Sequence, residues 1–431
     1  MTSGVFLNTE DFASPTLEAL AASGDLRAPK LHPSTQSFMR RVARYGGLND
    51  RVSVALARRR MRTLVTLVAS KQPVQSIVDR SVSGPGGPIP IRIVTPTTGA
   101  APRPALVWFP GGGFVIGDLA TAEPTARGLA NKLGAVIVCV DYRKAPEHML
   151  DDGYADAHAV LRWVFANAAG LGIDDTRIGV GGDSAGGNVA AVLAQEYTAV
   201  AGVNPLAVQV LVYPAVSVES EPARVRDAYG LLDAEALRWF ETHLAGATDP
   251  HSQRYYPLLT RNLSGLPPAV IVTAGYDPVR DEGIVYLDRL REAGVRAELL
   301  HYADDIHGFF SLDLVLPNAV AALTATADVV ADILDLDDAT REGTARSGAN
   351  LLRAAVDRRV RRAQAVVNYG LGQLVHTHLR TQRRLIGLLG LPAGRDVQAL
   401  NSRIVRLEHQ VRALRRQLEH PQEADADSVS A

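Results

Sequence analysis

A serine between two glycines, at the junction of a strand-like and a helix-like run, is the feature that most constrains the fold of this 431-residue chain. Residues 182–186 read Gly-Asp-Ser-Ala-Gly, with Ser184 at the centre. Residues 176–181 before it indicate a short strand, and residues 188–194 after it indicate the start of a helix. Only small neighbours allow so sharp a connection, so the pattern predicts a strained turn that exposes the serine hydroxyl. The alternative is a glycine-rich loop with an incidental serine.

The composition bounds the broad class of the protein. A hydrophobic content of 47% is typical of a globular chain, and the length allows one large domain with an appendage. The net charge of −1 gives the whole chain no reason to bind nucleic acid. The single cysteine, Cys139, lies in an apolar run, which predicts a buried, unreactive thiol and a reducing compartment. With no secretory leader and no apolar stretch of about 18 residues, we expect a cytoplasmic protein.

Strand-like and helix-like runs alternate between residues 76 and 335, which predicts an α/β domain with a mostly parallel sheet and helices on both faces. Residues 1–75 show only helical spacing and form a separate N-terminal region. The expected strands are 75–82, 89–95, 105–109, 135–140, 177–181, 208–213, 269–273 and 297–302, and the expected helices include 156–167, 187–197 and 282–292.

A serine nucleophile needs a base, a group that orients the base, and donors that stabilise an oxyanion. His307 follows a strand-like run and is the candidate base, whereas the alternative for a single histidine is a surface loop position. Asp277 follows the strand at 269–273 and is the candidate orienting acid. The alternative for Asp277 is helix capping, a role that we assign to Asp281. The order Ser, Asp, His along the chain fits a hydrolase built on such a sheet.

The candidate oxyanion donors lie after the strand at 105–109. The glycine run 111–113 allows the N–H groups of Gly112 and Gly113 to turn toward one point, and the N–H of Ala185 supplies a third donor. A flexible glycine loop is the alternative.

Several motifs together resemble the hormone-sensitive-lipase family of α/β-hydrolase carboxylesterases. They are Gly111-Gly112-Gly113-Phe114, residues 141–148 (Asp-Tyr-Arg-Lys-Ala-Pro-Glu-His), residues 182–188, Tyr213-Pro214, residues 277–282 and His307-Gly308-Phe309. The resemblance covers about residues 76–330. It implies the α/β-hydrolase fold, the triad Ser184, Asp277 and His307, and the oxyanion donors Gly112, Gly113 and Ala185. It also implies that residues 1–75 form a helical cap over the acyl pocket.

Two positions depart from the pattern of that family. Pro110 stands where the family usually has a histidine before the glycines, and we expect altered efficiency rather than loss of activity. Lys144 replaces a common leucine in a motif that is largely structural, in which Arg143 and Glu147 support the active-site loops. Asp183, beside the serine, is likewise expected to be structural.

The C-terminal extension, residues 340–420, is basic and helical in pattern. Residues 353–416 contain fourteen arginines and three acidic residues, and apolar positions from Leu352 to Leu374 follow helical spacing. Two interpretations are open for this amphipathic helix. It lies on an anionic or lipid surface, or it docks on the hydrolase domain or a partner helix.

Residues 397–418 carry an unbroken a/d heptad pattern, which predicts a parallel two-stranded coiled coil and therefore a homodimer. The segment from Leu388 to Glu408 also resembles the C-terminal part of polyhydroxyalkanoate granule-associated proteins, the phasins. That resemblance implies delivery to a storage granule or lipid surface. Residues 421–431 are expected to be a disordered acidic tail.

The sequence therefore predicts a serine carboxylesterase or lipase-like hydrolase that acts on small acyl esters through an acyl-enzyme, without metal or cofactor. A different hypothesis is a non-catalytic granule- or lipid-associated scaffold that retains the hydrolase fold. The complete triad argues against the scaffold, whereas Pro110 and the long extension keep it open.

Overall fold

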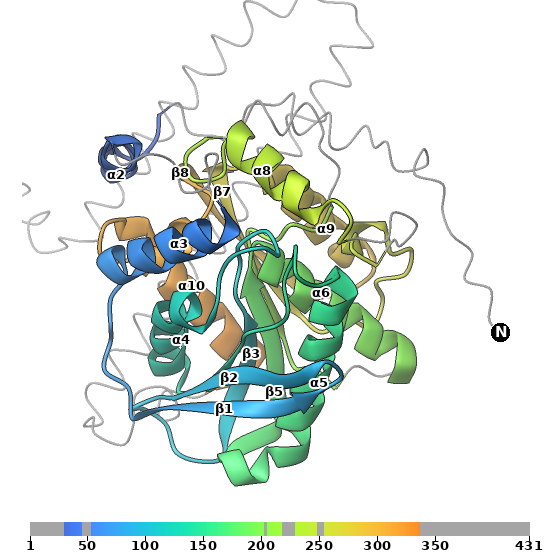
Figure 1. Cartoon of the computed structure of the whole chain (residues 1–431). Coiled ribbons are helices and arrows are strands. Elements are labelled where there is room, and N and C mark those ends of the chain that lie inside the picture. The colour runs from blue at the N-terminus through green and yellow to red at the C-terminus, as the bar shows by residue number, and fades with distance from the viewer. Residues whose placement is uncertain (1–29, 45–52, 202–204, 218–228, 248–253, 337–431) are drawn as a thin grey trace, which may run out of the picture. The chain divides into compact units, whose positions relative to one another are not determined.

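The computed structural model describes residues 30–44, 53–201, 205–217, 229–247 and 254–336 (Figure 1). The chain divides into two compact units, residues 1–346 and 347–431. All described helices and strands belong to the first unit. The predicted basic helix, the coiled coil at 397–418, the phasin-like segment and the tail at 421–431 lie outside the described residues.

An eight-stranded sheet forms the centre of the first unit (Figure 1). The strand order is β1-β2-β4-β3-β5-β6-β7-β8, in which β1 and β2 pair antiparallel with their neighbours and all pairs from β4 to β8 are parallel. The strands are β1 Ser76–Gly84, β2 Gly87–Thr95, β3 Arg103–Phe109, β4 Val136–Val140, β5 Ile173–Asp183, β6 Gln209–Val212, β7 Ala269–Tyr276 and β8 Ala297–Ile306. The predicted mostly parallel sheet is confirmed.

Helices cover both faces of this sheet, as predicted. Buried side chains of α4 and α10 share one apolar core with the sheet, and those of α5, α6 and α9 share the other. The helices are α2 Pro33–Arg44, α3 Val54–Val68, α4 Leu119–Leu133, α5 Leu150–Asn167, α6 Ala185–Ala201, α8 Ala234–Leu244, α9 Arg280–Glu292 and α10 Pro317–Ile333, with short 3-10 turns η2 Ala169–Leu171, η3 Pro257–Leu259 and η4 Phe309–Ser311.

The apolar pattern of β3 explains why it lies inside the sheet. Leu106 and Trp108 point into the core shared with α4, whereas Val107 and Phe109 point into the core shared with α6. All four side chains are essentially inaccessible to solvent. A strand covered on both faces must be apolar at every position, and this is why β3 shows no polar alternation.

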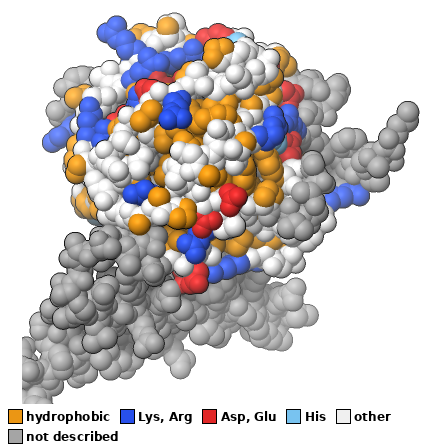
Figure 2. Space-filling view, turned by 90° about the horizontal axis from the view of Figure 1, so that it is seen from below, with side chains coloured by type: hydrophobic (Ala, Val, Ile, Leu, Met, Phe, Trp, Pro, Cys, Tyr) orange, Lys and Arg blue, Asp and Glu red, His pale blue; other side chains and the backbone are white. Residues whose placement is uncertain are grey.

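Helices of the N-terminal region and of a long connection add to this core structure. Within the predicted helical region 1–75, the described part forms α2 and α3, and α3 begins at the N-cap Ser53. Helix α8 lies in the long connection between β6 and β7, where no element was predicted from the sequence. None of the helices in the described ranges is both long and apolar enough to cross a bilayer. On the face shown in Figure 2, basic and acidic side chains are interspersed among polar and apolar ones.

Candidate active site

Ser184 lies on the tight turn between β5 and α6. β5 ends at Asp183 and α6 begins at Ala185, so Ser184 alone makes the connection, and its φ of 55° is in the left-handed region. This turn is shorter than predicted, because the helix begins directly after the serine. The Ser184 N–H donates to Val212 O on β6 over 2.8 Å, which fixes the turn against the neighbouring strand. A strained non-glycine residue held in this way is typical of functional positions.

The flanking glycines are required by the packing around the turn. A Cβ on Gly186 would lie 1.9 Å from the carbonyl oxygen of Phe109, and one on Gly182 would lie 2.4 Å from the carbonyl carbon of Gly186. Neither position has room for a methyl group. Glycine is therefore needed on both sides of Ser184, because the backbones of β3, β5 and α6 approach one another closely at this turn.

The structure brings Ser184, His307 and Asp277 into one hydrogen-bonded row. His307 follows the end of β8, and its Nε2 lies 2.9 Å from Ser184 Oγ. Its Nδ1 lies 2.9 Å from Oδ2 of Asp277, which follows the end of β7. Asp277 is 1% exposed and His307 is 8% exposed. With a proton on Nδ1 donated to the carboxylate, Nε2 is left as the acceptor for the serine hydroxyl.

The other oxygen of Asp277 is also held. Its Oδ1 accepts the N–H of Val279 over 2.9 Å, so the carboxylate is fixed at both ends. The capping role assigned to Asp281 is wrong. Helix α9 has Val279 at its N-cap, and Asp281 lies in the first turn, where it accepts a 2.6 Å hydrogen bond from Arg280 Nε. The turn held by Asp277 starts this helix two residues earlier than predicted.

The glycine loop after β3 lies beside this row. Gly112 and Gly113 have φ values of 126° and 57°, a conformation that side-chain-bearing residues rarely adopt. Within the described residues, their N–H groups donate to no acceptor, while Gly112 O accepts from Val115 and Ile116 and closes the loop. A Cβ on Gly113 would lie 2.4 Å from the ring of Phe240 on α8. Among the described residues, the loop thus offers two N–H donors that have no acceptor, and an aromatic ring covers them.

Comparison with known proteins gives the family. A family model described as "alpha/beta hydrolase fold" matches residues 106–311. Esterase LipI of Mycobacterium tuberculosis is 40% identical over 278 residues, covering 62% of this chain and 85% of the relative. The chain is a hormone-sensitive-lipase-family carboxylesterase. Carboxylesterase NlhH of the same organism is 40% identical over 276 residues, and the match covers 62% of this chain and 86% of NlhH.

Solved structures agree with this assignment. The hyperthermophilic esterase of the archaeon Pyrobaculum calidifontis has a TM-score of 0.66 to this carboxylesterase at 35% identity, covering 70% of this chain and 99% of that one. The prediction of a carboxylic ester hydrolase is confirmed, and the relatives favour it over the non-catalytic scaffold.

The glycine loop of this carboxylesterase is held without the usual histidine. The hydroxyl of Tyr142 donates to Pro110 O over 2.8 Å, inside the core. Lys144 Nζ lies 4.4 Å from the centre of the Tyr142 ring and donates to Asp141 over 2.6 Å. The two departures from the family pattern, Pro110 and Lys144, are thus connected through one tyrosine.

Asp183 supports the same loop from the strand before the serine. Its carboxylate accepts the N–H of Gly111, and burial raises the pKa of the carboxyl group. A Cβ on Gly111 would lie 2.4 Å from Asp183 Oδ2, so the first glycine of the run is needed for this contact. The structural role predicted for Asp183 agrees with these contacts.

Two aromatic residues near the row were not assigned a role from the sequence. The ring of Tyr213 lies 4.6 Å from that of His307, centre to centre, and burial raises the pKa of its hydroxyl well above its usual range. Phe240 covers Gly113 from the connection between β6 and β7. Two features of the sequence could have pointed to these residues: the Tyr213-Pro214 motif for the first, and the unusual length of the connection between β6 and β7 for the second.

Proposed function

We propose that Ser184, His307 and Asp277 are the catalytic triad of this carboxylesterase. Ser184 Oγ attacks the ester carbonyl while His307 Nε2 takes its proton, and His307 then protonates the leaving alcohol. Asp277 orients the imidazole and stabilises its protonated form. Water then attacks the acyl-enzyme through the same proton transfers and releases the carboxylic acid. The two 2.9 Å contacts of His307, to Ser184 and to Asp277, carry the proposal.

The oxyanion hole in this scheme is formed by the N–H groups of Gly112, Gly113 and Ala185. It is supported by the positive φ values of the two glycines and by the position of Ala185 at the first turn of α6, beside the serine. The loss of one such donor costs about 2.7–4 kcal/mol of barrier in well-studied hydrolases. The reaction uses the chain's own groups and a small acyl ester, without cofactor or metal.

The acyl pocket is shaped by a cap made from the N-terminal region, residues 1–75, together with α8. Helix α2 is attached to the segment before His307, since the N–H of His32 donates to Asp304 O over 2.8 Å. Phe240 of α8 covers the glycine loop, as described above. We divide the chain into this cap, the catalytic domain 76–335, the extension 340–420 and the tail 421–431.

Hydrolysis of p-nitrophenyl esters of increasing acyl length tests the triad. Ser184→Ala should lose activity on every chain length, by a factor on the order of 10⁶ if the nucleophile acts as in other serine hydrolases. The matched control is Ser83→Ala, an exposed serine on β1. Turnover by Ser184→Ala equal to that of the wild type on any ester would show that another group is the nucleophile.

The basic extension suggests a second function, which is delivery of the enzyme to a surface. We propose that residues 397–418 form a dimeric coiled coil and that the arginine-rich helix before it contacts a storage granule or anionic lipid. The charge excess and the heptad pattern carry this proposal. The full chain should elute as a dimer and sediment with granules or anionic vesicles, and a chain ending at residue 339 should do neither. Equal partition of both chains would contradict it.

A further inference from the structure

His307 loses one of its two hydrogen-bond partners during the proposed reaction. In the free enzyme its Nε2 lies 2.9 Å from Ser184 Oγ and its Nδ1 lies 2.9 Å from Asp277 Oδ2, so the imidazole is held at both nitrogens. Once Ser184 carries the acyl group, it has no hydroxyl proton to donate, and only the contact with Asp277 remains. The imidazole must nevertheless stay in place, because Nε2 then has to take a proton from water.

Tyr213 provides a contact to the imidazole that does not depend on the serine hydroxyl. The centres of the Tyr213 and His307 rings lie 4.6 Å apart, and the ring planes are tilted by 51°. This separation is at the short end of the range of about 4.5–7 Å that is usual for aromatic pairs. Because the two rings are so close, the imidazole cannot turn far about its Cβ–Cγ bond without meeting the Tyr213 ring.

The backbone on both sides of Tyr213 is fastened to the serine. The N–H of Ser184 donates to Val212 O over 2.8 Å, and the N–H of Ala215 donates to Ser184 O over 3.2 Å. Tyr213 lies between these two bonds, and its own N–H donates to Val272 O on β7 over 2.6 Å. Its φ of 35° is in the left-handed region, which a residue with a side chain adopts only where its surroundings enforce it. The Tyr213 backbone is therefore fixed relative to the nucleophile.

Buried aromatic side chains hold the Tyr213 ring in turn. Tyr213 and Phe309 are both buried, and their ring centres lie 6.1 Å apart at an angle of 58°. Tyr302 on β8 packs on Phe309, with a distance of 5.1 Å between the ring centres. A ring enclosed in this way stays in one orientation, because a packed interior leaves no room for another.

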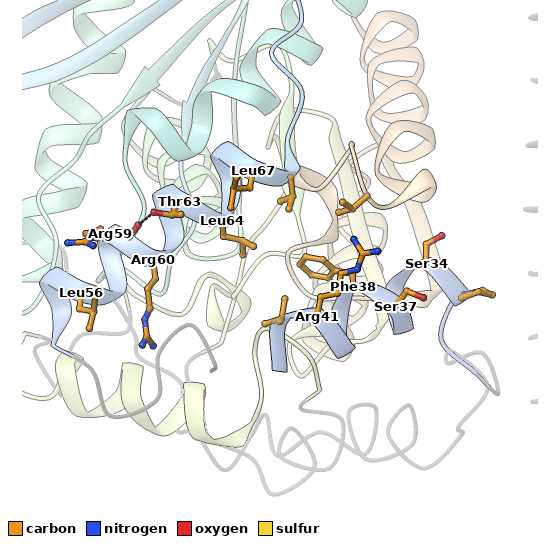
Figure 3. Close-up of a pocket in the computed structure, with 14 residues that line it drawn as sticks. Ser34, Ser37, Phe38, Arg41, Leu56, Arg59, Arg60, Thr63, Leu64 and Leu67 are labelled. Carbon is orange, nitrogen blue, oxygen red and sulfur yellow. Dashed lines mark hydrogen bonds between the residues drawn. The ribbon is translucent and has the colours of Figure 1, made fainter. Parts of the chain in front are cut away.

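The described cap helices α2 and α3 face a different space. Phe38 and Leu64 project into the hollow between these two helices (Figure 3). The described residues that line this hollow include neither Tyr213 nor a member of the triad. The ring against the imidazole is thus supplied by the end of β6.

We propose that Tyr213 is a positioning residue that keeps His307 aligned in the acyl-enzyme and so serves deacylation more than acylation. This inference rests on the proposed triad. Acylation starts from an imidazole held at both nitrogens, whereas deacylation starts from one held at Nδ1 alone. In deacylation water adds to the acyl carbonyl while Nε2 takes its proton, and Nε2 returns that proton to Ser184 Oγ as the bond from this oxygen to the acyl carbon breaks.

Pre-steady-state and steady-state kinetics of the full chain with p-nitrophenyl acetate test the proposal. Tyr213→Met replaces the ring by a flexible apolar side chain. Slower deacylation lowers kcat and KM by the same factor and leaves kcat/KM unchanged, because kcat/KM reports only the steps up to acylation. We expect kcat to fall about tenfold and p-nitrophenol to appear in a burst of about one equivalent per enzyme. Tyr213→Phe keeps the ring and should retain the kcat of the wild type.

Tyr286→Met is the matched control for the loss of a buried tyrosine. Tyr286 on α9 is fully buried, and its hydroxyl accepts from Gln195 Nε2 over 3.0 Å. This variant should be less stable, with kcat and KM unchanged. A folded Tyr213→Met in which kcat and kcat/KM fall equally, or in which kcat does not fall, would overturn the role of Tyr213. Wild-type turnover by Ser184→Ala would instead overturn the triad on which the inference rests.

A measurement on the unaltered tyrosine covers the case in which Tyr213→Met does not fold. Diethyl p-nitrophenyl phosphate phosphorylates the nucleophilic serine and so removes its hydroxyl proton, while Tyr213 stays as it is. The ring C–H proton resonances of His307, assigned with His307→Gln, should be displaced by the ring current of Tyr213 both before and after this reaction. Loss of the displacement on phosphorylation would show that the tyrosine does not hold the imidazole once the serine contact is gone.

Discussion

Thr35 on α2 donates its hydroxyl to Oδ1 of Asp305 over 2.7 Å, and Asp305 lies two residues before His307. The other oxygen of Asp305 accepts from Asn318 on α10 over 2.7 Å. Both Thr35 and Asp305 are buried, and burial raises the pKa of Asp305. An N-terminal helix is therefore joined to the segment that carries the proposed catalytic base.

Thr35→Ala should destabilise the fold and reduce kcat. The substitution removes a hydrogen-bond donor from the buried Asp305 carboxylate, which lowers the free energy of unfolding by about 1–3 kcal/mol. The loss of the donor also raises the pKa of Asp305 further in the folded state, because a bond to the charged form is removed. The stability loss should therefore be largest at pH values above the pKa of Asp305 and shrink as the pH falls through that pKa. Urea unfolding at two pH values measures this.

Thr35→Ser keeps the hydroxyl and is the control, so it should restore kcat. If Thr35→Ala lowers stability but leaves kcat and KM unchanged, the contact is structural and does not position the segment before His307.

The sequence predicted the strands of the sheet well because their apolar runs are set by burial on both faces. Leu106 and Val107 point into opposite cores, so consecutive apolar residues are what a strand covered on both faces requires. The assembly of Ser184, Asp277 and His307 was predictable for the same reason, since each follows a strand that ends at the same edge of a parallel sheet.

The roles of Phe240 and Tyr142 could not be predicted. Phe240 reaches Gly113 only because α8 folds back over the sheet edge, and helical periodicity does not reveal where a helix docks. The bond from Tyr142 to Pro110 joins two loops at the ends of adjacent strands. Such contacts depend on side-chain direction in three dimensions, which spacing along the chain does not fix.

Tyr142→Phe should lower kcat with little change in KM. The variant removes the 2.8 Å bond to Pro110 O while it keeps the ring, so the glycine loop loses a tether but the core stays filled. The expected stability loss is about 0.5–1.5 kcal/mol. Steady-state kinetics on a short p-nitrophenyl ester and thermal unfolding measure the two effects.

Tyr197→Phe is the matched control, because the Tyr197 hydroxyl is buried and has no hydrogen-bond partner among the described residues. An equal decrease in kcat for both variants would show that the bond to Pro110 O does not support catalysis.

Lys144→Met should reveal a pH-dependent contribution of the buried ammonium group. Burial lowers the pKa of Lys144 from its ordinary 10.5, although Asp141 pairs with it. At pH values between the lowered pKa and 10.5, the unfolded chain binds more protons than the folded chain, because Lys144 is already partly deprotonated in the folded state. The unfolding free energy of the wild type therefore rises with pH relative to that of Lys144→Met. Urea unfolding of both proteins at about pH 7 and about pH 10 checks the sign. Lys71→Met, at an exposed lysine, should show no such trend.

Gly186→Ala should abolish most activity, whereas Gly170→Ala should not. The new methyl group at residue 186 would lie 1.9 Å from Phe109 O, so β3 and the first turn of α6 must separate. That movement carries Ser184 away from His307, and a misplacement of about 1 Å can cost on the order of 100-fold in rate. A Cβ on Gly170 would meet no other atom within 4 Å, so Gly170→Ala serves as the control. The kcat/KM of each variant, with its melting temperature, measures the effect. Full activity of Gly186→Ala would mean that the close approach of these segments is not needed to hold the nucleophile.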